Sequence, residues 1–438
     1  MMNYLTQNLH LHRPFFLCFC FHRITLSHSP IVPKSRCCDL ALLFSGSGFV
    51  LHRGQAGNSD YLGRMGDLVS TLPEELICHI LSFLPTKQVV ATSILSKRWM
   101  PLWRSVSTLD FDDSDFNGSK KAYARFVQSV YAFIVSRDMH LPIEKVRLNC
   151  SSYVCDPATV SEWVNVVVQH RVQHLDLWLP LRYLYVQQPP NLSSIFTCKT
   201  LVVLKLHCTK LEPISSVDLP FLKLLHLKDL RFSKRACLAE LLSGCPILED
   251  FKAKRLYFHQ DVADTEFKTL PKLLGLVNNV KFLRIDGIAR RLGNGPGPYV
   301  FPMFHNLTHV ELEYRTYNTD WSEVVELLKC CPKLQVLIIN QPSIPFNEPD
   351  LLEKPAKWQY PPSVPKCILL HLKKCCLNNF RGTKGEFQFA KYIMRNGRFL
   401  KRMTISSGIF INQGGKVEML KKLSCCMRSS ATCKLSFN

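Results

Sequence analysis

The chain has 438 residues, 47% of them hydrophobic, and 55 Lys and Arg against 34 Asp and Glu give a formal net charge of +21. This hydrophobic content excludes a disordered chain, and the length suits two or three domains or one elongated repeat array. The basic balance suits an acidic partner. The cations are scattered singly, however, so a generally basic solvated surface is favoured over a nucleic-acid interface.

The 19 cysteines indicate a reducing environment. Their number is odd, several are adjacent, as in Cys330-Cys331, and no Cys-x-x-Cys pair has a second pair downstream. This pattern fits neither a zinc site nor a secreted disulfide framework. We therefore expect reduced thiols that act as small core residues, no metal, no cofactor, and a location in the nucleus or the cytoplasm.

Residues 1–64 differ in composition from the rest, with five of the 15 histidines and only two acidic residues. Their apolar cluster, residues 15–21, is too short to span a membrane, and His22 and Arg23 follow it where a secretory signal needs small residues. Met65 lies directly before the first recognisable motif. We therefore predict that residues 1–64 have no fold or lie upstream of the true start.

Residues 65–110 have the pattern of three short amphipathic helices. Apolar residues recur at every fourth position along the first of them: Leu72, Leu76, Ile80 and Leu84. Thr71 lies at capping-box spacing from Glu74, and Thr86 and Ser96 are candidate N-caps for the next two helices. A unit this small cannot bury so much apolar surface by itself. The alternative is an ordinary helical hairpin that caps the following domain.

The order of motifs in this segment is more specific than its amphipathicity. Leu-Pro, Ile-Leu-Ser-Phe-Leu-Pro, Leu-Ser-Lys-Arg-Trp and Leu-Trp-Arg follow one another between Leu72 and Arg104. This order closely resembles an F-box. The resemblance implies docking on a Skp-type adaptor, which links such proteins to a cullin–RING ubiquitin ligase. The residues expected to contact the adaptor are apolar side chains and prolines of this module: Leu72, Pro73, Leu76, Ile80, Leu81, Leu84, Pro85, Val89 and Val90.

Residues 111–345 contain a repeat of the form apolar-x-x-apolar-x-apolar. Its eight occurrences start 21 to 32 residues apart, close to the leucine-rich-repeat period. They start at Ile143, Val172, Leu201, Leu222, Leu248, Val280, Leu307 and Leu334. Each occurrence predicts a short strand, with helices or turns between, as at 237–242 and 321–328. The strands should form the curved parallel sheet of a solenoid.

Two phrases of these repeats, Gly244–Glu249 and Cys330–Gln335, resemble the repeat region of plant F-box/leucine-rich-repeat proteins. In that family the concave face or the C-terminal loops recruit the target. Alternation along each strand points the repeated leucines into the core and the intervening side chains outward. The outward residues expected to form a basic face for an acidic or phosphorylated target are Lys205, His207, His226, Lys228 and Arg284.

The C-terminal part begins with a proline-rich stretch, in which residues 346–366 are predicted to form an extended loop. A second loop is predicted for the Gly- and Pro-rich residues 293–298. Residues 367–438, with a strand-like segment at Ile368–Leu372 and a helix around Phe387–Met394, resemble an FBD domain. We expect this domain to cap the solenoid.

The chain contains no Gly-x-Ser-x-Gly, no phosphate-binding glycine-rich loop and no His-Glu-x-x-His. We therefore predict an α/β protein with a three-helix F-box, a leucine-rich-repeat solenoid and an FBD cap. It would serve, without catalysis, as the substrate-recognition subunit of an SCF-type ubiquitin ligase. Its partners would be the adaptor, through it a cullin, and a protein substrate, but no membrane. The alternatives are a basic repeat protein that binds nucleic acid and a repeat-cavity receptor for an anionic small molecule.

Overall fold

The computed structural model describes residues 72–116, 119–135, 137, 140–150, 155–185, 188–258, 273–286, 301–314, 321–342, 358, 360–409 and 411–438. Of the described residues, 72–111 together with 135, 137, 140 and 141 form one compact unit, and the other described residues form a second. The predictions for residues 1–64, for the loop at 293–298 and for most of the loop at 346–366 lie outside the described residues. None of the described helices is both long and apolar enough to cross a membrane.

The described part of the first unit begins with two short α-helices, α5 (Glu74–Leu81) and α6 (Thr86–Ala91). Pro73 and Pro85 are their N-caps, and neither helix has a side-chain cap. Proline suits these starts because its φ is already close to the helical value. The prediction of Thr86 as an N-cap was therefore wrong. Its buried hydroxyl instead accepts a hydrogen bond from the Asp110 backbone N–H at 2.7 Å.

The third helical segment of this unit consists of turns and 3-10 helices, η1 (Thr92–Ile94) and η2 (Leu102–Arg104). Ser96, predicted to cap a helix with its side chain, uses its backbone carbonyl, which accepts from the N–H groups of Trp99 and Met100. The strand β1 (Thr108–Asp112) follows and reaches the boundary between the units.

The second unit is built on a parallel sheet in which each strand pairs with the next along the chain. Its strands are β2 (Lys145–Asn149), β3 (His174–Trp178), β4 (Val203–Leu211), β5 (Leu224–Phe232), β6 (Asp250–Phe258), β7 (Phe282–Asp286), β8 (His309–Glu313), β9 (Val336–Asn340), β10 (Lys374–Phe380), β11 (Arg402–Ser407) and β12 (Lys434–Phe437). All eight predicted strands are confirmed, as β2 to β9.

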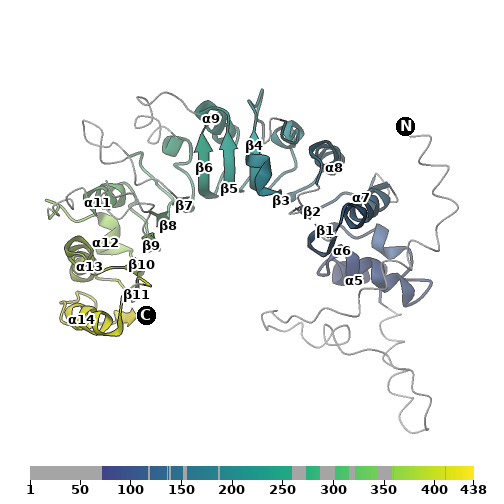
Figure 1. Ribbon diagram of the computed structural model, residues 1–438. Coiled ribbons are helices and arrows are strands. Elements are labelled where there is room, and N and C mark those ends of the chain that lie inside the picture. The colour runs from purple at the N-terminus through teal and green to yellow at the C-terminus, as the bar shows by residue number, and fades with distance from the viewer. Residues whose placement is uncertain are drawn as a thin grey trace, which may run out of the picture. The chain divides into compact units, whose positions relative to one another are not determined.

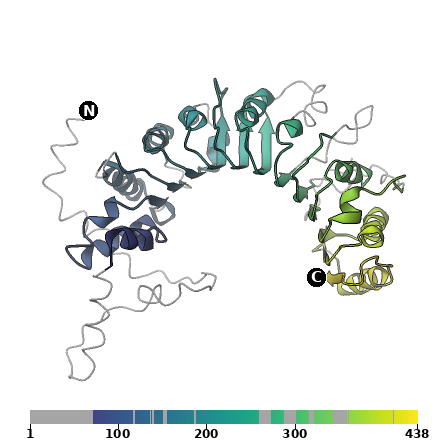
Figure 2. The ribbon, with the colours of Figure 1, turned by 180° about the vertical axis from the view of Figure 1, so that it is seen from behind.

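Helices lie on the outer side of this curved sheet, whereas the strands line its inner side (Figures 1 and 2). The helical segments of the second unit are η3 (Ser114–Phe116), α7 (Lys120–Val135), α8 (Pro157–Gln169), η4 (Leu181–Leu184), η5 (Ser193–Thr197), α9 (Arg235–Ser243), α11 (Trp321–Lys329), α12 (Lys366–Leu370), α13 (Lys384–Asn396) and α14 (Gln413–Ser424). We call the strand surface that faces away from these helices the open face. It presents, for example, Lys145, Arg147 and Asn149 of β2.

One row of buried side chains runs along the helix-covered side of the sheet through β11. Its members occupy register partners in consecutive strands: Val146, Leu175, Leu204, Leu225, Phe251, Leu283, Val310, Leu337, Cys375 and Met403. Alternation along each strand puts every second residue on this side, which is why the repeat pattern recurs. The C-terminal region thus continues the core of the solenoid.

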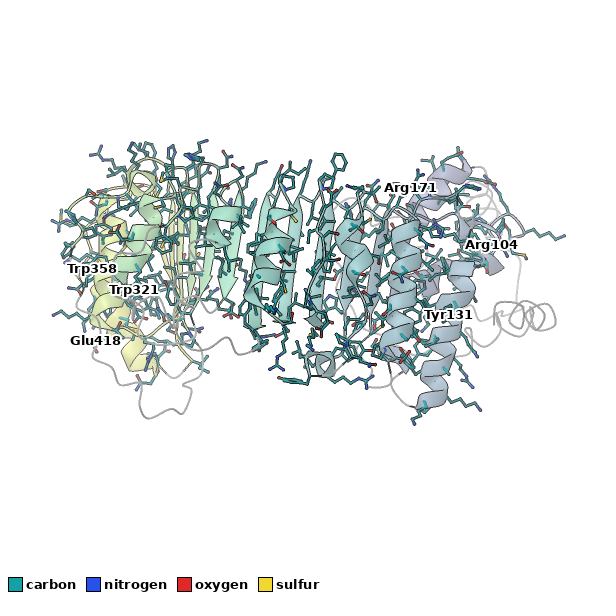
Figure 3. The ribbon with its side chains drawn as sticks, turned by 90° about the horizontal axis from the view of Figure 1, so that it is seen from above. Arg104, Tyr131, Arg171, Trp321, Trp358 and Glu418 are labelled. Atoms are coloured by element: carbon teal, nitrogen blue, oxygen red, sulfur yellow. The ribbon has the colours of Figure 1, made fainter. Side chains whose placement is uncertain are left out.

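Two features of the C-terminal region depart from the sequence prediction. The strand-like segment Ile368–Leu372 lies mostly in helix α12, which Pro365 starts, while the strand begins at Lys374. Aromatic contacts link α11 to α13, since Trp321 stacks on Phe389 with ring centroids 4.5 Å apart. Trp358 packs on the same ring, with the ring centroids 6.1 Å apart. Figure 3 shows Trp321 and Trp358 in the C-terminal part of the second unit. The predicted helix around 387–394 is confirmed as α13.

Candidate functional site

The helical module of the first unit has a small hydrophobic core of its own. Its buried members are Ile77, Leu81, Val89, Trp99, Leu102 and Val106, with Leu72, Cys78, Leu84 and Trp103 packed partly against them. The Arg98 guanidinium donates a hydrogen bond to the Leu72 carbonyl, which ties the start of the module to its third segment. The core is thus complete without the other apolar residues of the segment.

Four large apolar side chains of this module remain in solvent. Leu76 is 50% exposed, Phe83 74%, Leu95 56% and Met100 55%. Phe83 packs edge-on against His79, with ring centroids 5.1 Å apart. Single exposed apolar residues are normal on a protein surface, but four on so small a module are available to a partner. We call these four residues the apolar face.

The predicted adaptor contacts divide into exposed and buried residues. Pro73, Leu76 and Pro85 are exposed, and Leu72, Ile80, Leu84 and Val90 are half-buried. Leu81 and Val89, by contrast, are 1% exposed and belong to the core, so including them as contacts was wrong. Helical periodicity identifies an apolar stripe but does not say which part of it packs inward. Phe83, Leu95 and Met100 were missed because they lie in turns or just beyond a helix, outside that periodicity.

The predicted substrate residues lie on the open face of the solenoid, as expected. One register row there contains Arg147, Asp176, Lys205, His226, Lys252, Arg284 and Glu311. A second row holds Trp178, His207, Lys228 and Lys254. Trp178 stacks on His207 with ring centroids 3.8 Å apart, and the Lys228 ammonium lies 4.6 Å from the centre of the indole.

Carboxylates interleave with these cations, so the expected uniformly basic face is corrected to a mixed one. The distance from Lys205 Nζ to Asp176 Oδ2 is 3.7 Å. His226 Nε2 lies 3.3 Å from an oxygen of Asp250. The Arg284 guanidinium lies 3.3 Å from a Glu311 oxygen. Sequence alternation identified the outward residues but not which of them are partners.

Glu313 is shared by two cations of this face. The Lys254 ammonium donates to it at 3.0 Å and the Arg284 guanidinium at 3.2 Å. Burial by itself would raise the pKa of Glu313, but these bonds and charges outweigh it and hold the pKa below its ordinary value. At Asp176 burial likewise raises the pKa, but the His207 imidazole, whose Nε2 lies 3.5 Å from Oδ1, and the Lys205 charge hold the pKa below its ordinary value.

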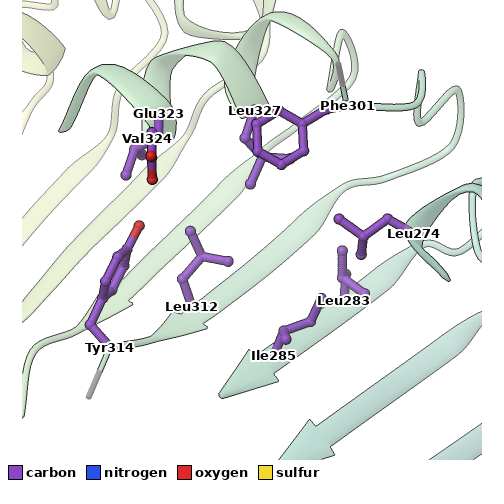
Figure 4. A pocket seen from close by; sticks show the side chains of 9 residues that line it. All are labelled: Leu274, Leu283, Ile285, Phe301, Leu312, Tyr314, Glu323, Val324 and Leu327. Atoms are coloured by element: carbon purple, nitrogen blue, oxygen red, sulfur yellow. The ribbon is translucent and has the colours of Figure 1, made fainter. Parts of the chain in front are cut away.

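A cavity lies between helix α11 and strands β7 and β8 (Figure 4). Its lining is Leu274, Leu283, Ile285, Phe301, Leu312, Tyr314, Glu323, Val324 and Leu327. Its volume of about 20 Å³ accommodates roughly one water molecule. Among these lining residues the only charged one, Glu323, is acidic. This cavity therefore offers no support for a receptor of anionic small molecules.

Comparison with known proteins places these features in a family. Family models match residues 69–110 ("F-box domain"), 160–270 ("FBD-associated F-box protein At5g56370, LRR repeats") and 359–405 ("FBD"). F-box/FBD/LRR-repeat protein At4g00160 of Arabidopsis thaliana is 31% identical over 404 residues, which cover 78% of this chain and 86% of that protein. The chain belongs to the plant F-box/FBD/LRR-repeat family.

Further members of the F-box/FBD/LRR-repeat family match over a similar length. F-box/FBD/LRR-repeat protein At4g26340 of Arabidopsis thaliana is 29% identical, with 85% of this chain and 100% of that protein covered. FBD-associated F-box protein At5g56370 of the same organism is 28% identical with the same coverage. The F-box match coincides with the module that carries the apolar face, and the FBD match contains β10 and the first part of β11.

Proposed function

We propose that the protein is the substrate-recognition subunit of an SCF-type ubiquitin ligase and performs no catalysis itself. In this proposal the F-box binds a Skp-type adaptor and, through it, a cullin, while the solenoid binds a protein target. The observation that carries the proposal is the apolar face. Its residues Leu76, Phe83, Leu95 and Met100 are exposed to solvent, while other residues of the module form its hydrophobic core. Burial of such residues by a partner is the main driving force for association.

The test compares two charge introductions of equal chemistry. Leu76→Glu/Phe83→Glu alters the apolar face, whereas Leu181→Glu/Phe221→Glu alters a leucine and a phenylalanine of the solenoid that are 60% and 58% exposed. Central apolar contacts carry about 2 kcal/mol or more each, so the double variant should lose Skp-type adaptor binding more than tenfold. The control should bind normally. All the substituted positions are exposed, so circular dichroism should show unchanged folding in both variants.

Full adaptor binding by Leu76→Glu/Phe83→Glu would overturn the proposal. Leu72→Ala/Pro73→Ala is a less specific probe, because Leu72 also packs against the core of the module. A loss of binding in that variant would reflect both a lost contact with the adaptor and a less stable module. The exposed pair Leu76 and Phe83 tests the contact alone.

The solenoid half of the proposal places the target on the open face, including Lys205, His207, His226, Lys228 and Arg284. Reversing Lys205, Lys228 and Arg284 to Glu should weaken target capture and leave adaptor binding intact. Targets would be identified by co-purification from plant cells under proteasome inhibition. We place this assembly in the nucleus or the cytoplasm, where thiols stay reduced, which a fluorescent fusion would test.

A further inference from the structure

The positive charge of the chain is concentrated at its C-terminal end. Residues 358–438 contain 15 Lys and Arg and only two acidic residues, Glu386 and Glu418, so they contribute +13 of the total +21. Glu386 is buried and accepts hydrogen bonds from the backbone of Thr383 and Arg381. Glu418 pairs with Lys422 at 2.7 Å within helix α14. Neither carboxylate is on a strand of the open face.

Part of this charge forms a row on the open face. Lys374, Arg402 and Lys434 are register partners in β10, β11 and β12. Their neighbours in the first two strands, Cys375 and Met403, are buried on the helix side, so Lys374 and Arg402 point the other way. Neighbouring strands are about 4.8 Å apart, so the three cations repel one another.

The described residues supply no carboxylate within 4.0 Å of Lys374, Arg402 or Lys434. Burial and, to a smaller extent, the charge of Lys374 lower the pKa of His309, which lies two strands away. Two further exposed cations, Lys373 and Lys401, directly precede the row in β10 and β11.

The same register row is apolar on the side towards the middle of the solenoid. It continues from Lys374 through Val336 and His309 to Phe282. Phe282 is 41% exposed and stacks on His309 with ring centroids 4.3 Å apart. The row therefore presents an aromatic and aliphatic stretch followed by three cations. Nothing in the packing of the sheet requires this order, because all of these positions face solvent.

We propose that this row, from Phe282 to Lys434, binds an acidic peptide segment of the target protein that lies across the strands. The inference rests on the proposed function and names the chemistry of the target. An apolar residue of the segment would pack on Phe282 and Val336, and its carboxylates would pair with Lys374, Arg402 and Lys434. Six strands span about 24 Å, which an extended segment of about seven residues covers.

Fluorescence anisotropy on the full chain bound to its adaptor would test this inference. The probe is a labelled peptide with one phenylalanine followed by a run of glutamates, and its partner probe has glutamines instead. Lys374→Glu/Arg402→Glu/Lys434→Glu is the test variant. Lys384→Glu/Lys391→Glu/Lys421→Glu is the control, because it changes the net charge equally at exposed positions of α13 and α14.

We expect the glutamate peptide to bind and the glutamine peptide not to bind. The test variant should lose affinity about tenfold or more, since three ion pairs become repulsions, while the control variant should change it less than about threefold. Equal losses in both variants would show attraction by net charge alone and overturn the inference. Preferential binding of a short single-stranded oligonucleotide would overturn it too, since the partner would then be a nucleic acid.

Measuring adaptor binding distinguishes a failure of this inference from a failure of the proposed function. The test variant should retain full adaptor binding, because its substitutions are outside the F-box. Loss of adaptor binding in Leu76→Glu/Phe83→Glu, with peptide binding intact, concerns the F-box alone. If the triple reversal unfolds the end of the sheet, the single exposed change Arg402→Glu takes its place, and unaltered peptide binding by that variant would overturn the inference.

Discussion

The open face of the solenoid uses charge differently in its middle, β3 to β8, and at its C-terminal end, β9 to β12. In the middle, Lys205, Lys252, Lys254 and Arg284 each have a carboxylate within 4.0 Å, and Glu313 contacts both Lys254 and Arg284. At the end, Lys374 and Arg402 are direct register partners with no acid between them. Both regions are parallel sheet in which consecutive strands pair. The difference teaches that charges satisfied within the fold stabilise it, whereas unpaired charges remain available to a partner.

The largest expected effect is the loss of stability on truncating a core side chain. It should be equal in the two regions, because their buried rows are alike. Leu204 of β4 and Met403 of β11 are both fully buried members of the same row. Leu204→Ala and Met403→Ala should each lower the free energy of unfolding by about 3 kcal/mol, from lost burial and the cavity left behind. Equilibrium unfolding in urea measures both. A much smaller loss for Met403→Ala would mean that the C-terminal end packs more loosely than the middle.

The next largest effect is the loss of stability on removing a charge, and it should differ between the two regions. Glu313→Gln leaves Lys254 and Arg284 without their shared carboxylate and should cost about 1–2 kcal/mol of unfolding free energy. Lys374→Gln should cost nothing measurable, because it removes one of three repelling cations. Urea unfolding of both variants checks the contrast. Similar losses for the two would remove the distinction drawn above.

Acid should weaken the middle of the solenoid through its paired carboxyls. The pKa values of Asp176 and Glu313 are lowered in the folded protein. A carboxyl with a lowered folded pKa adds stability above its unfolded pKa, near 4, and loses it as pH falls through the folded pKa. Melting temperature should therefore drop below about pH 5, and less so in Asp176→Asn/Glu313→Gln, which should already be less stable at pH 7. An unchanged pH dependence in that variant would contradict the assignment.

Salt should have the smallest effect and opposite signs in the two regions. Screening weakens the ion pairs of the middle and relieves repulsion among Lys374, Arg402 and Lys434, each by less than about 1 kcal/mol. Hydrogen exchange of backbone amides reports the regions separately. Raising the salt concentration should speed exchange in β4 to β6 and slow it in β10 to β12. A change of the same sign throughout would indicate a general ionic effect instead.

Local sequence patterns correctly predicted the secondary-structure elements that depend on neighbouring residues alone. The eight strands β2 to β9 follow from alternation of apolar residues, as does the side to which Lys205 and Arg284 point. The same reasoning missed β10 as a repeat, because Cys375 occupies the position that leucine, valine or phenylalanine holds in the earlier repeats. It also assigned Ile368 to a strand, although Pro365 and the burial of Cys367 and Ile368 favour helix α12.

Contacts between distant residues lay beyond that reasoning. Leu81 and Val89 belong to the F-box core because they pack against the third segment around Trp99 and Leu102. Lys254 and Glu313 are 59 residues apart, and only the curvature and register of the sheet bring them to 3.0 Å. No spacing rule links such positions, since the lengths of the intervening helices and loops vary from repeat to repeat.

The sequence by itself determined the family, the order of its parts and which side chains of each strand face outward, because motif order and two-residue alternation are properties of the chain. Only the tertiary structure decided which outward charges neutralise one another and which, at Lys374, Arg402 and Lys434, have no carboxylate within reach among the residues that the structure describes. Pairing depends on distance across neighbouring strands, and that distance exists only once the strands are in register.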